Sequence, residues 1–154
     1  MCLIATAPVD PSVCPITNDG WFPGIDLKRV RAAMRLDGTV TETRLTEAVI
    51  AAMARVNAEL ATWQMAQRLA GWTNLAAVPA PHLNGESVQL MRYRRAVHHR
   101  AKADLTARYR DFDTTTSGAQ HAQALEDTIA EDRREARWAI RDLLGMPQTT
   151  VALI

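Results

Sequence analysis

Residues 41–71 read TETRLTEAVIAAMARVNAELATWQMAQRLAG and decide the fold of this 154-residue chain. Apolar side chains recur at steps of three or four along the stretch, at Leu45, Val49, Ala52, Val56, Leu60 and Trp63. That spacing is the period of one face of an α-helix. Thr41 is placed to cap the helix at its start, and Gly71 is placed to end it. The stretch therefore predicts a helix of about thirty residues, roughly 45 Å long at 1.5 Å per residue.

Three further helices are expected around this one. They are predicted over about residues 25–37, 84–110 and 120–144, the first with Asp26 and the second with Asn84 as N-cap. No region alternates apolar and polar residues well enough to predict a sheet. The fold class is therefore all-α, a bundle of about four helices of which two or three are long.

Both ends of the chain differ from this helical middle. Residues 1–24 hold four of the seven prolines and predict an extended N-terminal arm, with Trp21 and Phe22 as candidates to dock it on the core or on a partner. Residues 25–145 form the predicted helical domain. Residues 146–154 form an extended C-terminal tail, because its last seven residues are uncharged and rich in β-branched side chains.

Composition restricts the class of protein. Lysine and arginine number 18 against 17 acidic residues, 47% of residues are apolar and 23% are charged. This is an ordinary globular composition, which excludes whole-chain disorder and argues against a DNA-coating protein. Sixteen of the basic residues are arginine. Arginine suits interfacial ion pairs, although a skewed genomic base composition gives the same bias.

The cysteines and the apolar runs point to a soluble intracellular protein. Cys2 and Cys14 match no zinc-ligand spacing, and the chain has no disulfide framework, so reduced thiols are expected. Residues 1–8 lack a basic start and have only a short apolar run, which does not predict a signal peptide. The longest uncharged stretches fall well short of the roughly 18 apolar residues of a transmembrane helix.

Motifs for catalysis, cofactors or metals are missing from the sequence. It contains no G-x-S-x-G, P-loop, H-E-x-x-H or Rossmann fingerprint, so no catalytic, metal or cofactor residues are predicted. The four histidines, His82, His98, His99 and His121, are expected on the solvated surface. A helix-turn-helix across the Asp37-Gly38 turn is a weaker alternative, because the following helix is too long and Ala-rich for a recognition helix.

Charge is distributed unevenly over the last two predicted helices. Residues 88–110 carry a strongly basic set that includes Arg92, Arg94, Arg95, Arg100 and Lys102. The fourth helix carries acidic residues that include Glu126, Glu131 and Glu135, interleaved with arginines. The basic helix either pairs with acidic groups of its own chain, or meets another subunit, or meets nucleic acid phosphates. The spacing of Glu131 and Glu135 suits a divalent cation, but a face of salt bridges is the favoured interpretation.

Several short stretches of the sequence also resemble a known family, the head completion (L protein) family of temperate contractile-tailed phages. The resemblance lies in residues 21–31 (WFPGIDLKRVR), 34–36 (MRL), 38–40 (GTV), 57–60 (NAEL), 70–73 (AGWT), 84–87 (NGES), 108–110 (RYR), 137–140 (RWAI) and 151–154 (VALI). It covers about residues 21–154, and only the arm differs. No role is transferred to that arm.

The resemblance implies a structural protein of the virion, made in the bacterial host cytoplasm, with no enzyme activity and no membrane partner. Such a protein binds beneath the portal protein after DNA packaging, and a tail terminator or tail-completion protein then attaches to it. A portal has twelve-fold symmetry, so a ring of twelve copies with a heterologous interface is implied. In related connectors the C-terminal segment docks into the portal, which makes candidates of Thr149, Thr150, Val151, Ala152, Leu153 and Ile154.

Two functions stay open at this point. The first is the head–tail connector, with the basic and acidic helices as candidate subunit interfaces and packaged DNA as a non-specific contact. The alternative is a nucleic-acid-binding helical module that uses Arg92, Arg94, Arg95, Arg100 and Lys102, whose binding would weaken steeply with salt.

Overall fold

The computed structural model describes residues 15–110 and 118–147. Along these residues the order of elements is α1 (Leu27–Ala33), α2 (Glu42–Leu69), a short 3-10 helix η1 (Leu75–Ala77), β1 (His82–Leu83), β2 (Glu86–Ser87), α3 (Val88–Arg110) and α4 (Gly118–Leu143). The prediction of a helical bundle of about four helices, two or three of them long, is confirmed, and three of the described helices are long. None of the described helices is both long enough and apolar enough to cross a membrane.

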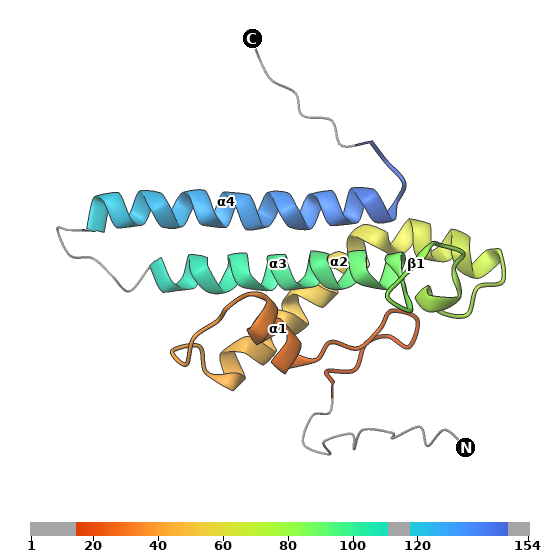
Figure 1. The fold of residues 1–154 in the computed structure, drawn as a ribbon, viewed down its shortest axis with the longest axis horizontal. Coiled ribbons are helices and arrows are strands. Elements are labelled where there is room, and N and C mark those ends of the chain that lie inside the picture. Colours follow the sequence, from red (N-terminus) through yellow and green to blue (C-terminus); the bar gives the residue numbers. More distant parts are fainter. Residues whose placement is uncertain (1–14, 111–117, 148–154) are drawn as a thin grey trace, which may run out of the picture.

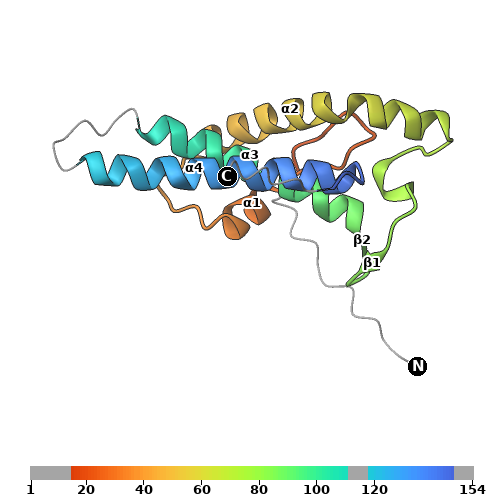
Figure 2. The same cartoon turned by 90° about the horizontal axis from the view of Figure 1, so that it is seen from above.

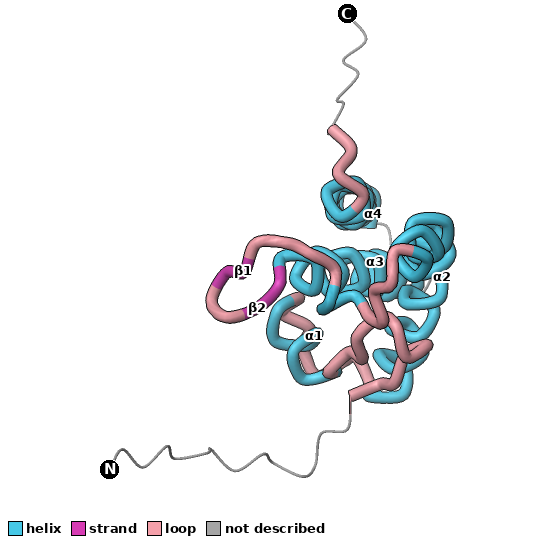
Figure 3. The backbone as a smooth tube through the Cα atoms, turned by 90° about the vertical axis from the view of Figure 1, so that its right-hand side faces the viewer, coloured by secondary structure: helices cyan, strands magenta, loops and turns pink. Residues whose placement is uncertain are grey.

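Helix α3 lies at the centre of the bundle. Seen along the long axis of the molecule, α4 lies on one side of α3, and α1 and α2 lie on others (Figure 3). Helices α3 and α4 run antiparallel side by side and make the most extensive helix contact in the described chain (Figure 1). Because α3 is surrounded, its Tyr93, Val97 and Ala101 are fully buried.

Helix α2 follows the sequence prediction closely. The Oγ1 atom of Thr41 accepts a hydrogen bond from the backbone N–H of Arg44, and Gly71 follows the last turn with a φ of +96°. The predicted apolar face is the buried face, with Leu45, Val49, Ala52, Val56 and Leu60 all in the core. Burying each Val or Leu side chain stabilises the fold by about 1.5–3 kcal/mol.

Helix α1 begins where predicted but ends earlier. The Asp26 carboxylate accepts a hydrogen bond of 2.8 Å from the backbone N–H of Lys28, as expected for an N-cap. The helix then stops at Ala33 rather than at Asp37, because Arg35 turns into the left-handed region at a φ of +52°. The N–H of Leu36 bonds back to the carbonyl of Arg31 at 3.0 Å, which closes the helix end.

The prediction that Asn84 caps the third helix is wrong, and so is the absence of any strand. Asn84 and Gly85 form the turn of a small antiparallel hairpin, β1–β2, with φ values of +50° and +75°. Asn-Gly is a preferred pair for such a tight turn, since both central residues need positive φ. Helix α3 begins after the hairpin, and the Ser87 hydroxyl accepts a hydrogen bond from the N–H of Gln89 at 3.3 Å.

The described part of the predicted arm, residues 15–24, packs against the helices. Ile16 and Ile25 pair through two backbone hydrogen bonds of 2.8 and 3.0 Å. Between them, Trp21 and Phe22 are buried in the main core. The segment therefore forms a loop that crosses the core rather than an extension away from it.

Candidate functional site

The basic face of α3 lies against acidic groups of its own chain. Arg95 pairs with Glu135 of α4, Arg100 with Glu59 of α2, and Lys102 lies 3.4 Å from the Asp132 carboxylate. We call the contact of Arg95, His99 and Lys102 with Asp132 and Glu135 the α3–α4 seam. Of the three interpretations of the basic helix, pairing with acidic groups of its own chain is the one that agrees with these contacts.

Arg94 pairs with a residue outside the α3–α4 seam. Both of its terminal nitrogens donate to the two carboxylate oxygens of Glu86 on β2, a bidentate pair. The Arg94 guanidinium holds the pKa of the Glu86 carboxyl below its ordinary value. This pair fixes the β1–β2 hairpin to the first turns of α3.

The remaining charged candidates are Arg92, Glu131 and Glu126. Arg92 donates to the Gln89 side chain at 3.4 Å, and Glu131 lies 3.8 Å from Arg134. Glu126 lies on the exposed face of α4. Across the described residues no group of histidine, cysteine or carboxylate side chains is arranged to hold a metal ion.

The prediction that the histidines lie on the solvated surface is wrong for His98. His98 is only 8% exposed, and its Nε2 atom has no hydrogen-bond partner among the described residues. Burial, aided by the nearby Arg94 charge, lowers its pKa to about 4, so the ring is neutral at pH 7. His99 lies beside it, with Nδ1 at 2.8 Å from Asp132, which is itself 3% exposed. His82 is exposed, as expected, and the side chain of His121 lies outside the described residues.

A polar network that the sequence did not suggest fixes the N-terminal loop. The Tyr93 hydroxyl donates to the Asn57 side-chain oxygen at 2.6 Å, and the Asn18 amide donates to the Tyr93 oxygen at 2.8 Å. The Asn57 amide donates in turn to the Asn18 oxygen at 2.8 Å. Burial raises the pKa of the Tyr93 hydroxyl, so it stays protonated and able to donate. The N-terminal loop, α2 and α3 are thereby joined by a closed ring of three hydrogen bonds.

Trp21 and Phe22, the predicted docking pair, dock on this same core. The Phe22 ring stacks on Tyr93 with centroids 4.8 Å apart, and Trp21 meets Trp63 of α2 edge to face at 5.9 Å. The Trp21 indole N–H also donates to the carbonyl of Trp72 at 3.0 Å. Their partner within the described structure is the chain's own core.

Asp19 holds the turn that presents these two rings. Partial burial opposes ionisation of its carboxyl, but hydrogen bonds from the N–H groups of Phe22 and Trp21 outweigh this and lower the pKa of Asp19. The side chain of Gln64 on α2 donates to the same carboxylate at 2.9 Å. The turn is thus built from Asp19 and is attached to α2.

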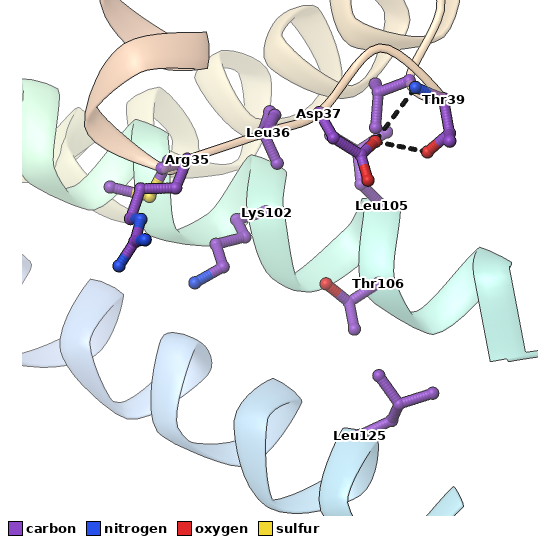
Figure 4. A pocket seen from close by; sticks show the side chains of 10 residues that line it. Arg35, Leu36, Asp37, Thr39, Lys102, Leu105, Thr106 and Leu125 are labelled. Carbon is purple, nitrogen blue, oxygen red and sulfur yellow. Dashed lines mark hydrogen bonds between the residues drawn. The ribbon is translucent and has the colours of Figure 1, made fainter. Parts of the chain in front are cut away.

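An open pocket of about 350 Å³ lies between the α1–α2 turn and helices α3 and α4 (Figure 4). Its lining is mixed, with apolar Leu36 and Leu105 beside the Arg35 and Lys102 cations. The Asp37 carboxylate does not point at a second acid or base but accepts hydrogen bonds from Thr39, which lower its pKa. Asp37 and Thr39 therefore bond to each other within the turn that borders the pocket.

The predicted portal-docking residues 149–154 lie outside the described residues, and so do Cys2 and Cys14. What the structure defines is a mainly helical bundle in which basic residues of α3 pair with carboxylates of the same chain. Comparison with known proteins assigns this bundle to a family. The chain belongs to the phage head completion protein (GPL) family, whose model matches residues 16–154.

Two curated relatives extend over most of the chain. It is 43% identical over 139 residues to the head completion/stabilization protein of Escherichia phage P2, covering 90% of this chain and 82% of the relative. It is 27% identical over 142 residues to the probable head completion/stabilization protein of Haemophilus phage HP1 (strain HP1c1), covering 90% of this chain and 91% of the relative. The comparison with solved structures finds no match. The predicted family is therefore confirmed.

Proposed function

We propose that this chain is a structural head completion protein that acts as a head–tail connector. It binds under the portal protein after DNA packaging, forms a ring of about twelve copies there, and presents the surface to which the tail terminator or tail-completion protein attaches. It would then be a virion component that assembles in the host cytoplasm. The observation that carries the proposal is the 43% identity to the phage P2 protein across 90% of this chain.

The fold supports a passive mechanism. A connector keeps DNA in the head by extending the portal channel, and this requires a rigid body rather than a reactive group. The closed Tyr93–Asn57–Asn18 network and the α3–α4 seam hold the helices in one arrangement. No turnover is needed for this role.

The C-terminal tail is the proposed portal-docking element. Val151, Leu153 and Ile154 are apolar, and the segment carries no charged side chain, which suits addition of an extended segment to a partner. We assign this role to residues 149–154 of the tail as a whole, because main-chain hydrogen bonds supply much of the affinity in such contacts.

The experiment mixes the full chain with the portal protein of its own phage and images the complex. A stoichiometric layer beneath the portal is expected, and removal of residues 148–154 should abolish it. A matched control removes residues 1–14, which the family model does not match, and should retain the layer. Absence of any layer with the full chain, or its full retention without residues 148–154, would overturn the connector proposal.

The nucleic-acid alternative has less support. Four of its five residues, Arg94, Arg95, Arg100 and Lys102, meet carboxylates of the same chain. Those pairs would have to exchange for phosphates on binding. Duplex binding at low salt that weakens steeply as salt rises would favour this alternative, and flat binding curves would eliminate it.

A further inference from the structure

One segment of the chain, which lies at the end of the molecule where α2 finishes, carries no charged side chain (Figure 1). Residues 69–85 contain no Lys, Arg, Asp or Glu, and residues 60–68 add only Arg68, in a chain that is 23% charged. We call residues 69–85 the uncharged end. Depletion of charge together with exposed large apolar side chains marks the centre of protein interfaces. Leu69 is 84% exposed and Leu83 is 59% exposed in the described structure.

An open apolar patch, which we call the α2 groove, lies beside this end on the outer face of α2, and the lining residues all belong to that helix. It has a volume of about 390 Å³ and is lined by Ala61, Thr62, Met65, Ala66 and Leu69. Leu60, which faces the core, lies on the opposite side of the helix, so the groove is directed away from the body of the molecule. Met65, in the middle of the groove, is 65% exposed.

A projecting apolar side chain lies on the β1–β2 hairpin. Leu83 precedes the Asn84-Gly85 turn, and the hairpin is held by three kinds of contact: its own ladder, the Arg94–Glu86 pair, and a 2.9 Å bond from the N–H of Val88 to the carbonyl of Pro81. A rigid element loses little conformational freedom when it binds. Leu83 is therefore a well-prepared anchor for an apolar groove.

The hairpin and the groove lie on opposite flanks. The end view in Figure 3 has β1–β2 on one side of α3 and α2 on the other, and the view from above agrees (Figure 2). A feature on one flank that complements a different feature on the opposite flank gives a heterologous contact. Such contacts repeat head to tail and close into rings when the rotation permits.

We propose that neighbouring copies in the ring meet through this pair, with the Leu83 hairpin of one copy seated in the α2 groove of the next. The inference rests on the proposed ring function and names the contact that builds it. It also explains why the α3 charges are not needed between subunits, since Glu59, Glu86 and Glu135 pair with them inside each copy.

The proposed contact between the hairpin and the α2 groove is small, so it is expected to form only where copies are already held together. A hairpin tip in a shallow groove falls below the roughly 1,200 Å² of a stable interface, so free copies should stay monomeric at ordinary concentrations. Binding to a portal holds copies side by side and raises their effective concentration. The ring is then expected on the portal and not in free solution.

Cysteine cross-linking tests the pairing. In a background with Cys2→Ser and Cys14→Ser, one protein carries Leu83→Cys and a second carries Met65→Cys, and both are bound to the portal and treated with a short bismaleimide. A mixture of the two should give a cross-linked dimer, whereas either protein alone should give none. A single chain carrying both substitutions should give a ladder that extends beyond the dimer.

Each alternative result has its own meaning. Dimers from Met65→Cys alone would show an α2–α2 contact and overturn the inference. A portal-bound layer without cross-links in the mixture would overturn the inference while leaving the connector function intact. Failure of the unsubstituted protein to bind its portal would overturn the proposed function, and the inference with it.

A charge substitution gives a second readout that does not depend on cross-linking chemistry. Leu83→Asp and Met65→Asp should each weaken cooperative loading on the portal by about tenfold or more, as expected for anchor residues. The matched control is Ile50→Asp, an exposed apolar residue on the same helix but outside the groove. Unfolding midpoints equal to that of the unsubstituted protein must accompany the loss. Equal loading by all three variants would contradict the proposal.

Discussion

The α3–α4 seam and the uncharged end differ in their side chains: the seam has paired charges, and the uncharged end has exposed apolar groups. In the seam, Arg95 and Lys102 meet Glu135 and Asp132 of the same chain, so most of the attraction is used within one molecule. At the uncharged end, Leu69 and Leu83 stay largely exposed. The difference indicates that a near-neutral, arginine-rich chain need not use its charges for partners. Substitutions in the seam should lower stability, and those at the uncharged end should lower assembly.

The largest effect on stability is expected from pH, through His98. Its folded pKa of about 4 lies below the unfolded value of 6.5, so below pH 6.5 the unfolded chain takes up a proton that the folded chain does not. Stability should therefore fall as pH falls from 6.5 towards 4, by about 3 kcal/mol at 1.36 kcal/mol per tenfold change in proton affinity. Urea unfolding across this range measures it.

The variant His98→Met isolates the contribution of this one residue. Its unfolding free energy should depend less on pH between 6.5 and 4 than that of the unsubstituted protein, while His82→Gln, at an exposed position, should leave the dependence unchanged. If His98→Met and the unsubstituted protein lost stability in parallel, His98 would not be the group responsible.

Asp132→Ala comes next. The carboxylate is 3% exposed and lies between His99 and Lys102, so its removal leaves two donors partly buried without their acceptor. The expected loss is about 2 kcal/mol of unfolding free energy, and Asp132→Asn should lose less. Chemical denaturation measures both. If Asp132→Ala lowered portal loading and left the unfolding free energy unchanged, the seam would act in assembly. That result would contradict the division of roles between the seam and the uncharged end.

Tyr93→Phe tests the network beneath the N-terminal loop. Removing the hydroxyl leaves the Asn57 oxygen without its donor and the Asn18 amide without one acceptor, at a cost of about 1–2 kcal/mol. Thermal unfolding, with Asn18→Ala and the double variant, should show that the two losses do not add. Simple additivity would mean that the three side chains do not act as a unit.

The smallest effect is expected at Arg95. The Arg95 side chain is about half exposed in its ion pair with Glu135. Exposed ion pairs contribute about 0.2–1 kcal/mol to the free energy of unfolding. A double-mutant cycle of Arg95→Ala and Glu135→Ala measures the coupling in denaturant. Coupling well above that range, or its insensitivity to added salt, would show that the seam is more deeply desolvated than its exposure indicates.

The helices could be predicted because their signals are local. The spacing from Leu45 to Trp63 fixed the face of α2, and Gly71 marked its end. The error at Asn84 has a local cause too, since Asn serves both as a helix cap and as the first residue of a tight Asn-Gly turn. Reading Asn84-Gly85 as a hairpin signal would have found β1 and β2.

The site contacts could not be predicted, because they join residues far apart in sequence. Asn18 and Tyr93 are 75 residues apart, and His99 and Asp132 are 33 residues apart. Their meeting depends on the register between packed helices, which no local pattern encodes. The same holds for the Leu83 hairpin and the α2 groove, whose relation appears only once the two flanks are seen in space.

Electron cryo-microscopy of the full chain bound to the portal protein tests the central claim most directly. The account predicts a closed layer of about twelve copies under the portal, with the β1–β2 hairpin of each copy against α2 of the next and the C-terminal tail on the portal. A portal without added density, or with copies bound apart from one another, would contradict it.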